Sequence, residues 1–223
     1  MSDFALQRKN MVEGQVQTAD VTDRRILRAM SGIPREAFAP ANLQSLAYFD
    51  QDLCVSPAAD GQPARYLLAP TLQARMIQAL AIDAGAVVLD VGCASGNGSA
   101  ILARLAQTVV GLEVDNDLAD TAARTLSTLS LDNVVVVKGA LQAGWPSEGP
   151  YDAILINGTV TEVPESMLAQ LKNGGRLVGV LAAGAVGHVT LFERSGALFS
   201  SRKLFDATAP TLPGFERAPE FVF

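Results

Sequence analysis

The residues best suited to chemistry lie together in one glycine-rich stretch, Leu89-Asp90-Val91-Gly92-Cys93-Ala94-Ser95-Gly96-Asn97-Gly98. An apolar run precedes this stretch and a helical pattern follows it, which predicts a turn between a strand and a helix. Glycine allows such a turn to be tight and allows ligand atoms to approach the backbone closely. Because parallel α/β sheets bind nucleotides at the carboxyl ends of their strands, the stretch predicts a nucleotide-type site.

The spacing of the glycines separates two classes of cofactor. A dinucleotide site needs Gly-x-Gly-x-x-Gly, and that frame reads Gly92, Ala94 and Asn97 here, so it fails at its last position. An acid followed by Gly-x-Gly-x-Gly reads Asp90, Gly92, Ala94 and Gly96, with one Gly-to-Ala change. This pattern resembles that of Rossmann-like methyltransferases, which use S-adenosylmethionine (SAM). The acid suits a cofactor with a charged amino group and no phosphate.

A second acidic residue supports the same interpretation. Glu113 ends the next predicted strand, 21 residues after Gly92. A carboxylate at that place can accept hydrogen bonds from both ribose hydroxyls. The alternative is an ordinary strand-to-helix corner with Glu113 as a solvated acid.

The elements around the turn alternate between strand and helix. Apolar runs predict strands at 87–91, 108–113, 134–137, 153–156 and 177–181, and helical patterns lie at 70–81, 96–106, 115–129 and 163–171. Asn173-Gly174-Gly175 is expected to stop the last of these helices. Two further strands, at 187–194 and 199–206, are expected to form an antiparallel pair. This order predicts an α/β fold with a doubly wound, mostly parallel, seven-stranded sheet.

The first 80 residues have a different pattern. Helices are predicted over 3–18, from a cap at Thr22 as far as Pro34, and over 41–48, whereas 50–69 reads as a loop. We therefore expect an N-terminal helical segment over residues 1–80 and a SAM-binding α/β domain over residues 81–223. The two parts are expected to form one compact unit.

The composition excludes several classes of function. A net charge of −6 argues against a generic nucleic-acid binder, and two cysteines with one histidine are too few for a zinc site made of protein ligands alone, so no metal site is predicted. A disulfide between Cys54 and Cys93 stays open, although free thiols are favoured. The sequence shows no signal-peptide pattern at its start and no long apolar run. We expect a cytoplasmic protein that neither enters a membrane nor binds nucleic acid, whereas its oligomeric state stays open.

Several short segments, which follow one another along most of the chain, indicate which protein family the sequence resembles. They include Val21-Thr22-Asp23-Arg24-Arg25-Ile26-Leu27-Arg28-Ala29-Met30, Ile33-Pro34-Arg35-Glu36-Ala37-Phe38-Ala39-Pro40 and Gln170-Leu171-Lys172-Asn173-Gly174-Gly175-Arg176-Leu177-Val178. This set resembles the protein-L-isoaspartate O-methyltransferase family. The resemblance implies methylation of the carboxylate of an isoaspartyl residue in a damaged protein, as a step of protein repair. Such a carboxylate is already ionised at neutral pH, so catalysis would consist mainly of alignment.

The loop expected to contact the methyl acceptor departs from the family. The family's Gln-[Ser/Thr]-Ile-Ser-x-Pro loop, aligned on Pro70, reads Arg65-Tyr66-Leu67-Leu68-Ala69-Pro70. The resemblance implies that the second hydroxyl contacts the acceptor carboxylate, which Leu68 cannot do. Losing that bond would cost roughly 1.5–3 kcal/mol. Arg65 and Tyr66 are candidate substitute donors, and the alternative is that Leu68 simply packs in an altered loop. The catalytic residues stay unassigned.

Two further departures lie where the cofactor is expected. The family's Gly-Asp-Gly, whose Asp lies near the adenine, reads Gly139-Ala140-Leu141, so Ala140 offers no side-chain acceptor while Leu141 could pack on the ring. Asn157 stands where the family has a small pair of residues, and we expect it after the fourth strand, facing the cofactor. The predicted cofactor-binding residues are therefore Asp90, Gly92, Cys93, Ala94, Ser95, Gly96, Glu113, Val114, Ala140, Leu141 and Asn157.

Alternative functions stay open beside isoaspartyl methylation. The loss of the acceptor-loop hydroxyl favours a methyltransferase that acts on a small molecule or another protein group. A nucleic-acid base methyltransferase is disfavoured, since Asn157-Gly158-Thr159-Val160 lacks the Asn/Asp-Pro-Pro-aromatic turn. A non-catalytic binding protein that keeps only the fold is the third possibility. The expected partner is a protein or peptide carboxylate, or else a small molecule.

Overall fold

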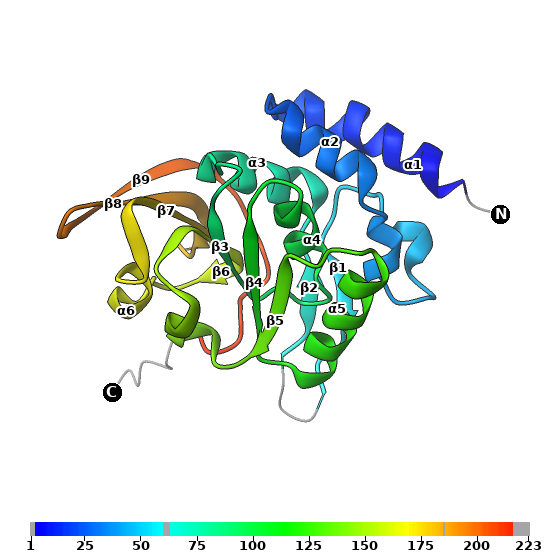
Figure 1. Ribbon diagram of the computed structural model, residues 1–223. Helices are drawn as coiled ribbons and strands as arrows, with labels where there is room; N and C mark the ends of the chain where they lie inside the picture. Colours follow the sequence, from blue (N-terminus) through cyan, green and yellow to red (C-terminus); the bar gives the residue numbers. More distant parts are fainter. Residues whose placement is uncertain (1–2, 60–62, 185, 216–223) are drawn as a thin grey trace.

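The computed structural model describes residues 3–59, 63–184 and 186–215. Within these residues one sheet of seven strands forms the centre, in the order β5-β4-β3-β6-β7-β8-β9 (Figure 1). Strands β5 to β7 run parallel, whereas β8 is antiparallel to both of its neighbours. The predicted doubly wound, mostly parallel sheet is therefore confirmed. The strands are β3 (Val87–Val91), β4 (Thr108–Glu113), β5 (Val134–Lys138), β6 (Tyr151–Val160), β7 (Leu171–Leu181), β8 (His188–Ser195) and β9 (Leu198–Asp206).

Helices and short helical turns connect and cover these strands. The α-helices are α1 (Phe4–Met11), α2 (Arg24–Gly32), α3 (Pro70–Leu80), α4 (Asn97–Ala103), α5 (Asn116–Thr128) and α6 (Glu165–Leu168). A π-helical turn, η1 (Val12–Val16), and 3-10 turns η2 (Gln17–Ala19), η3 (Arg35–Phe38), η4 (Gln44–Leu46), η5 (Leu141–Ala143) and η6 (Pro146–Glu148) complete the set. No helix in the described ranges is long and apolar enough to cross a membrane.

Side-chain caps explain where several helices begin. The Asp115 carboxylate accepts from the amides of Asp117 and Leu118 at the start of α5. Pro70 is the first residue of α3, a position that needs no amide donor. Helix α2 is capped by Asp23, which accepts from the Arg25 amide at 2.8 Å, so the predicted Thr22 cap is displaced by one residue.

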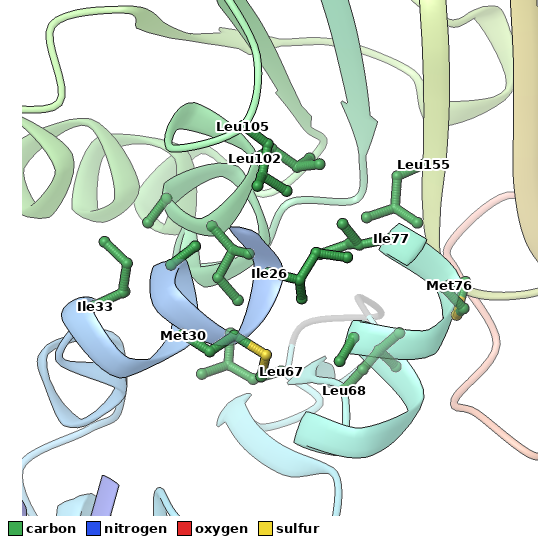
Figure 2. Packing of buried hydrophobic residues seen from close by; sticks show 14 of the residues in the cluster. Ile26, Met30, Ile33, Leu67, Leu68, Met76, Ile77, Leu102, Leu105 and Leu155 are labelled. Carbon is green, nitrogen blue, oxygen red and sulfur yellow. The ribbon is translucent and has the colours of Figure 1, made fainter. Parts of the chain in front are cut away.

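Successive strand residues point to opposite faces of the sheet and build two apolar clusters. Val88 and Leu155 face a cluster that includes residues of α2, α3 and α4 (Figure 2). Leu89 and Ile156 face the other cluster, which is completed by η5, α6 and the C-terminal segment. We use the term C-terminal segment for residues 207–215, which follow β9 (Figure 1, red).

The region predicted as a loop over 50–69 contains a small sheet. Strands β1 (Leu53–Ser56) and β2 (Arg65–Leu67) pair antiparallel, with Cys54 opposite Tyr66. Each strand is too short for a periodic pattern, and prolines lie between them, so only the pairing in space reveals the element. The prediction of a loop was therefore wrong for these residues.

One buried arginine ties the N-terminal part to this region. Arg35 is 2% exposed and donates to Ala47 O, Leu68 O and Asn97 Oδ1, each at 2.7 Å. Burial lowers the pKa of Arg35 to about 10. The arginine therefore connects η3 to the residues before α3 and to the first turn of α4.

Three predicted boundaries near the second half of the sheet were wrong. Helix 163–171 shortens to α6, because β7 already begins at Leu171. Gly174, expected in a helix stop, lies inside β7 at a φ of 78°, beside a register shift between β6 and β7. Strand β6 extends through Asn157 to Val160, so Asn157 lies within the strand instead of after it. Pairing with neighbouring strands overrides the local glycine signal.

Candidate functional site

The glycine-rich turn adopts the conformation that its sequence predicts. It connects β3 to α4, with φ values of 73° at Gly92 and 97° at Gly96. Ala94 also has a positive φ, 50°, at the position where the motif usually has glycine. The amides of Gly92 and Cys93 donate to Leu112 O at 2.8 and 3.1 Å, which fixes the turn against the end of β4.

Glu113 lies directly against this turn, as the spacing predicted. Its side chain is fully buried. Glu113 Oε2 accepts from the Ala94 amide at 2.7 Å, and Oε1 accepts from the amides of Val114 and Asp115 at 2.9 and 3.2 Å. The carboxylate is thereby held by backbone donors from both sides of the corner.

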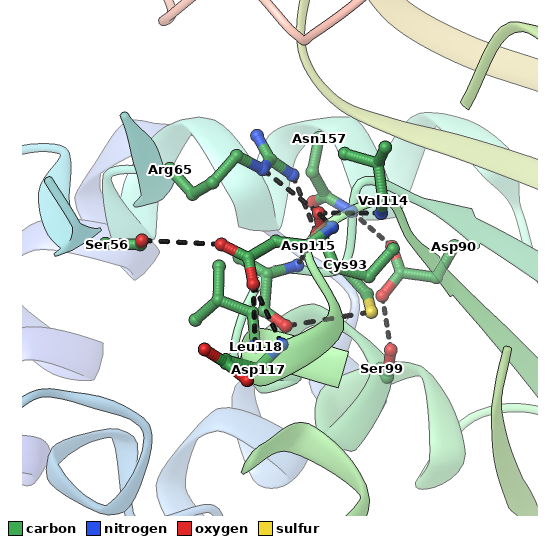
Figure 3. A network of polar contacts seen from close by, with 12 residues as sticks. Ser56, Arg65, Asp90, Cys93, Ser99, Val114, Asp115, Asp117, Leu118 and Asn157 are labelled. Atoms are coloured by element: carbon green, nitrogen blue, oxygen red, sulfur yellow. Dashed lines mark hydrogen bonds and ion pairs between the residues drawn. The ribbon is translucent and has the colours of Figure 1, made fainter. Parts of the chain in front are cut away.

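Arg65 completes the surroundings of Glu113. Its Nε donates to Oε1 at 3.1 Å and its Nη2 donates to Oε2 at 2.8 Å, with the two side chains 4% and 0% exposed. Figure 3 shows Arg65 reaching from β2 toward the corner formed by Cys93 and Val114. The sequence suggested Arg65 as a donor to the methyl acceptor, whereas the structure places its guanidinium on the predicted ribose-binding carboxylate.

The other acceptor-loop candidates lie away from this carboxylate. Leu68 is 1% exposed and packs in the cluster around Met76 and Ile77 (Figure 2). Tyr66 is half-buried on β2. The interpretation in which Leu68 packs in an altered loop agrees with this burial.

Asp90 and Asn157 form a second buried polar group beside the turn. Asp90 accepts from Ser99 Oγ at 2.5 Å and from Asn157 Nδ2 (Figure 3). Gln73 Nε2 donates to Asn157 Oδ1 at 3.3 Å. Burial raises the pKa of Asp90 to about 6, although both of its hydrogen bonds favour the charged form. Sequence analysis missed Gln73, which lies on α3 and whose buried Oε1 has no hydrogen-bond partner among the residues that the structure describes.

Four further predicted cofactor residues are placed as follows. Burial raises the pKa of the Cys93 thiol well above its usual value, so this residue is a small protonated side chain and no nucleophile. Ser95 is buried and donates to Phe38 O at 2.6 Å. Ala140 is exposed, while Leu141 is 1% exposed in the second apolar cluster.

The C-terminal segment lies over the glycine-rich turn and contacts it through Leu212. A Cβ added to Gly92 would lie 2.9 Å from Leu212 Cδ2 and 3.1 Å from Arg65 Nη2, and one added to Gly158 would lie 2.7 Å from Leu212 Cγ. The Leu212 amide donates to Thr159 O at 3.0 Å, and the Thr159 amide donates to Pro210 O at 2.8 Å. Sequence analysis had no signal for this contact.

The site fits SAM in residue type but is closed in this conformation. The positive-φ glycines and the carboxylate at the end of β4 are the groups that such a cofactor needs. However, Arg65 already pairs with both oxygens of Glu113, and Leu212 already fills the space over Gly92. A cofactor that approached Glu113 and Gly92 would therefore require these two side chains to move.

Comparison with known proteins supplies the family. The family model described as protein-L-isoaspartate(D-aspartate) O-methyltransferase matches residues 6–205. Protein-L-isoaspartate O-methyltransferase 1 of Rhodopseudomonas palustris (strain HaA2) is 41% identical over 175 residues, which cover 78% of this chain and 69% of the relative.

Two solved structures share the fold. A protein-L-isoaspartate O-methyltransferase matches with a TM-score of 0.82 at 27% identity, over 93% of this chain and 66% of that one. A putative protein-L-isoaspartate O-methyltransferase from Plasmodium falciparum, in complex with S-adenosyl-L-homocysteine (SAH), matches with a TM-score of 0.76 at 20% identity, over 92% and 97% of the two chains. The chain belongs to the protein-L-isoaspartate O-methyltransferase family.

Proposed function

We propose that this protein is a SAM-dependent O-methyltransferase whose acceptor is the carboxylate of an isoaspartyl residue in a protein or peptide. Family membership over residues 6–205 supports the reaction class. The observation that carries the cofactor assignment is the Glu113 carboxylate, held 2.7 Å from the Ala94 amide of the glycine-rich turn. Bound SAM would supply a methyl group already activated on its sulfonium.

In this proposal the chain's own residues bind and align. Gly92 and Gly96 allow close backbone approach, and Glu113 accepts from the ribose hydroxyls. Leu141 provides an apolar wall for the adenine. The acceptor carboxylate is ionised at neutral pH, so no general base is assigned.

The proposal also covers the roles of the two parts of the chain and the location of the protein in the cytoplasm. The first 80 residues would shape the acceptor side, and residues 81–223 would hold the cofactor. Both Cys54 and Cys93 are free thiols, which suits the reducing cytoplasm.

The test of the acceptor uses two peptides of identical sequence, one with an isoaspartyl residue and one with an ordinary aspartyl residue. After incubation with the protein and methyl-labelled SAM, label is expected in the isoaspartyl peptide alone. Equal labelling of both peptides would contradict the assigned specificity.

The test of the cofactor site is Glu113→Ala with calorimetric titration of SAH. Loss of a charge-assisted hydrogen bond should weaken binding by about 1.5–3 kcal/mol. Unchanged affinity would remove Glu113 from the site.

One observation favours a second candidate, a methyltransferase with a different acceptor. Leu68 replaces the hydroxyl expected to contact the acceptor, and its side chain is buried in the core. Saturable SAH binding without labelling of the isoaspartyl peptide would support this candidate.

A third candidate, a non-catalytic binding protein, is favoured by the buried pairing of Glu113 with Arg65. Absence of SAH binding under every condition would support that reading.

A further inference from the structure

Two side chains from separate parts of the chain occupy the crevice assigned to the cofactor. Arg65 comes from β2, and Leu212 comes from the C-terminal segment beyond the last strand. They meet at Gly92, where an added Cβ would lie within 3.1 Å of Arg65 Nη2 and within 2.9 Å of Leu212 Cδ2. The two side chains therefore close the site from two directions.

The hydrogen-bonding capacity of Glu113 is already filled. A carboxylate offers about four lone-pair positions. Glu113 accepts from Arg65 Nε and Nη2 and from the amides of Ala94, Val114 and Asp115. Ribose hydroxyls can reach these oxygens only by replacing the guanidinium, since the backbone amides are fixed by the turn and by the end of β4.

Leu212 is seated by contacts of its own segment. Thr159 Oγ1 donates to Ala209 O at 2.6 Å, Gln142 Nε2 donates to Gly214 O at 2.6 Å, and Thr159 forms a parallel bridge with Thr211. Leu212 itself is 1% exposed in the apolar cluster that includes Leu141, the residue assigned to the adenine. The segment thus fills the apolar side of the crevice.

The same segment is the covering element best able to leave. Apart from the bridge at Thr211, its residues lie outside helices and strands, and its hydrogen bonds to β6 and η5 are made singly and not as part of the sheet's continuous ladder. Segments outside regular secondary structure open at lower free energy than the strands of a sheet. The turn and Glu113, by contrast, are fixed by β3 and β4.

We propose that Arg65 and the C-terminal segment form an internal gate that competes with SAM for this crevice. Binding then requires Arg65 to leave Glu113 and Leu212 to leave Gly92. Because only open molecules bind the cofactor, the apparent dissociation constant equals the intrinsic one divided by the fraction of molecules that are open. This inference rests on the proposed SAM-binding function and adds a regulation of the same site.

The first experiment is calorimetric titration of SAH into the wild-type chain, Leu212→Ala and Leu177→Ala. Leu177 is fully buried in the same apolar cluster but lies on β7, so it is a control for the loss of an equal side chain. Opening the gate should lower the dissociation constant of Leu212→Ala by about tenfold or more. Leu177→Ala should bind as the wild-type chain does.

A second variant removes the other half of the gate. Arg65→Gln introduces the residue that the family motif has at this position, and it frees Glu113 from the guanidinium. The dissociation constant should again fall. Circular dichroism of each variant verifies that it is folded before titration.

A reversible clamp tests the gate without removing either side chain. Residues paired across neighbouring strands lie about 5 Å apart, within the reach of a disulfide. Thr159→Cys together with Thr211→Cys, in a Cys54→Ser background, should lock the segment over the turn when oxidised. SAH binding should disappear on oxidation and return on reduction, with the disulfide verified by mass spectrometry.

The outcomes separate the gate from the function on which it rests. The gate is overturned if Leu212→Ala and Arg65→Gln bind SAH with wild-type affinity, or if the clamped and the reduced protein bind SAH equally well. Either result leaves SAM binding intact. Folded protein and variants that bind no SAH at millimolar concentration overturn the proposed function and the gate with it. Tighter binding by both variants and loss of binding in the clamped protein support the gate.

Discussion

The ion pair between Arg65 and Glu113 should contribute much more to stability than an exposed pair of equal length. The perturbation is Arg65→Met, which keeps an unbranched side chain and removes the charge. It leaves the Glu113 carboxylate fully buried, with three backbone amides as its remaining donors in the described part of the chain. A buried carboxylate without its cation is strongly destabilised.

The structure sets the size of this effect. Breaking a buried ion pair typically costs 3–5 kcal/mol, and the retained amides favour the lower end, about 3 kcal/mol. Glu113→Gln should cost about as much, because it leaves the Arg65 guanidinium buried without its anion. The double variant should cost less than the sum by about 2–3 kcal/mol, since neither charge is then left alone.

Urea-induced unfolding measures these free energies. The single tryptophan, Trp145, packs against the second apolar cluster, so its fluorescence should report the loss of that packing. Equal m-values among the variants would show that each variant exposes the same amount of surface on unfolding.

The control is an ion pair of the same length at the surface. Lys138 Nζ lies 2.8 Å from Asp120 Oδ1, as Arg65 Nη2 does from Glu113 Oε2, but its side chains are 42% and 55% exposed. Lys138→Met should leave the unfolding midpoint unchanged, because solvent screens such pairs. If Arg65→Met and Lys138→Met shift the midpoint equally, the reasoning from burial is refuted.

Three further predictions follow from the same site. Leu68→Ser should lower the free energy of unfolding by about 3 kcal/mol or more and should not raise the rate of transfer to isoaspartyl peptides above that of the wild-type chain, because the side chain points into the core; urea unfolding and the peptide assay check both. Burial raises the pKa of Asp90 from 3.8 to about 6, so its contribution to stability is present below about pH 4 and is lost as pH rises through about 6. Asp90→Asn cannot ionise at this position. Between about pH 4 and pH 7 its free energy of unfolding should therefore fall by about 3 kcal/mol less than that of the wild-type chain; parallel pH profiles of the two proteins would contradict this. Gly92→Ala should destabilise the wild-type chain by more than it destabilises Leu212→Ala, where the strain of the positive φ, about 1–2 kcal/mol, and the contact with Arg65 Nη2 remain but the contact with Leu212 is gone; equal costs in the double-mutant cycle would show that Leu212 does not press on Gly92.

Local pattern was enough to predict the centre of the fold. The apolar runs of β3 and β4, the glycines between them and the spacing to Glu113 are set within a short stretch of chain, and parallel strands must end at one edge of the sheet. The contact between Glu113 and the turn therefore follows from the order of the elements. The antiparallel strands β8 and β9 were predicted for the same reason, since they are adjacent in sequence.

Other elements depended on partners that lie far away along the chain. Strands β1 and β2 become visible only when they pair, and β7 begins before Asn173 because pairing with β6 offsets a glycine signal. Asn157 is turned toward Asp90 because β6 continues past the expected end of the strand.

The sequence by itself determined which cofactor class the turn suits and which family the chain resembles, because glycine spacing and a carboxylate at a strand end are local properties. Only the tertiary structure decided whether that site is open. Arg65 lies 48 residues before Glu113, and Leu212 lies more than 100 residues after Gly92. No periodic pattern in the sequence relates positions so far apart, so their closure of the crevice depends on how the sheet brings distant segments together.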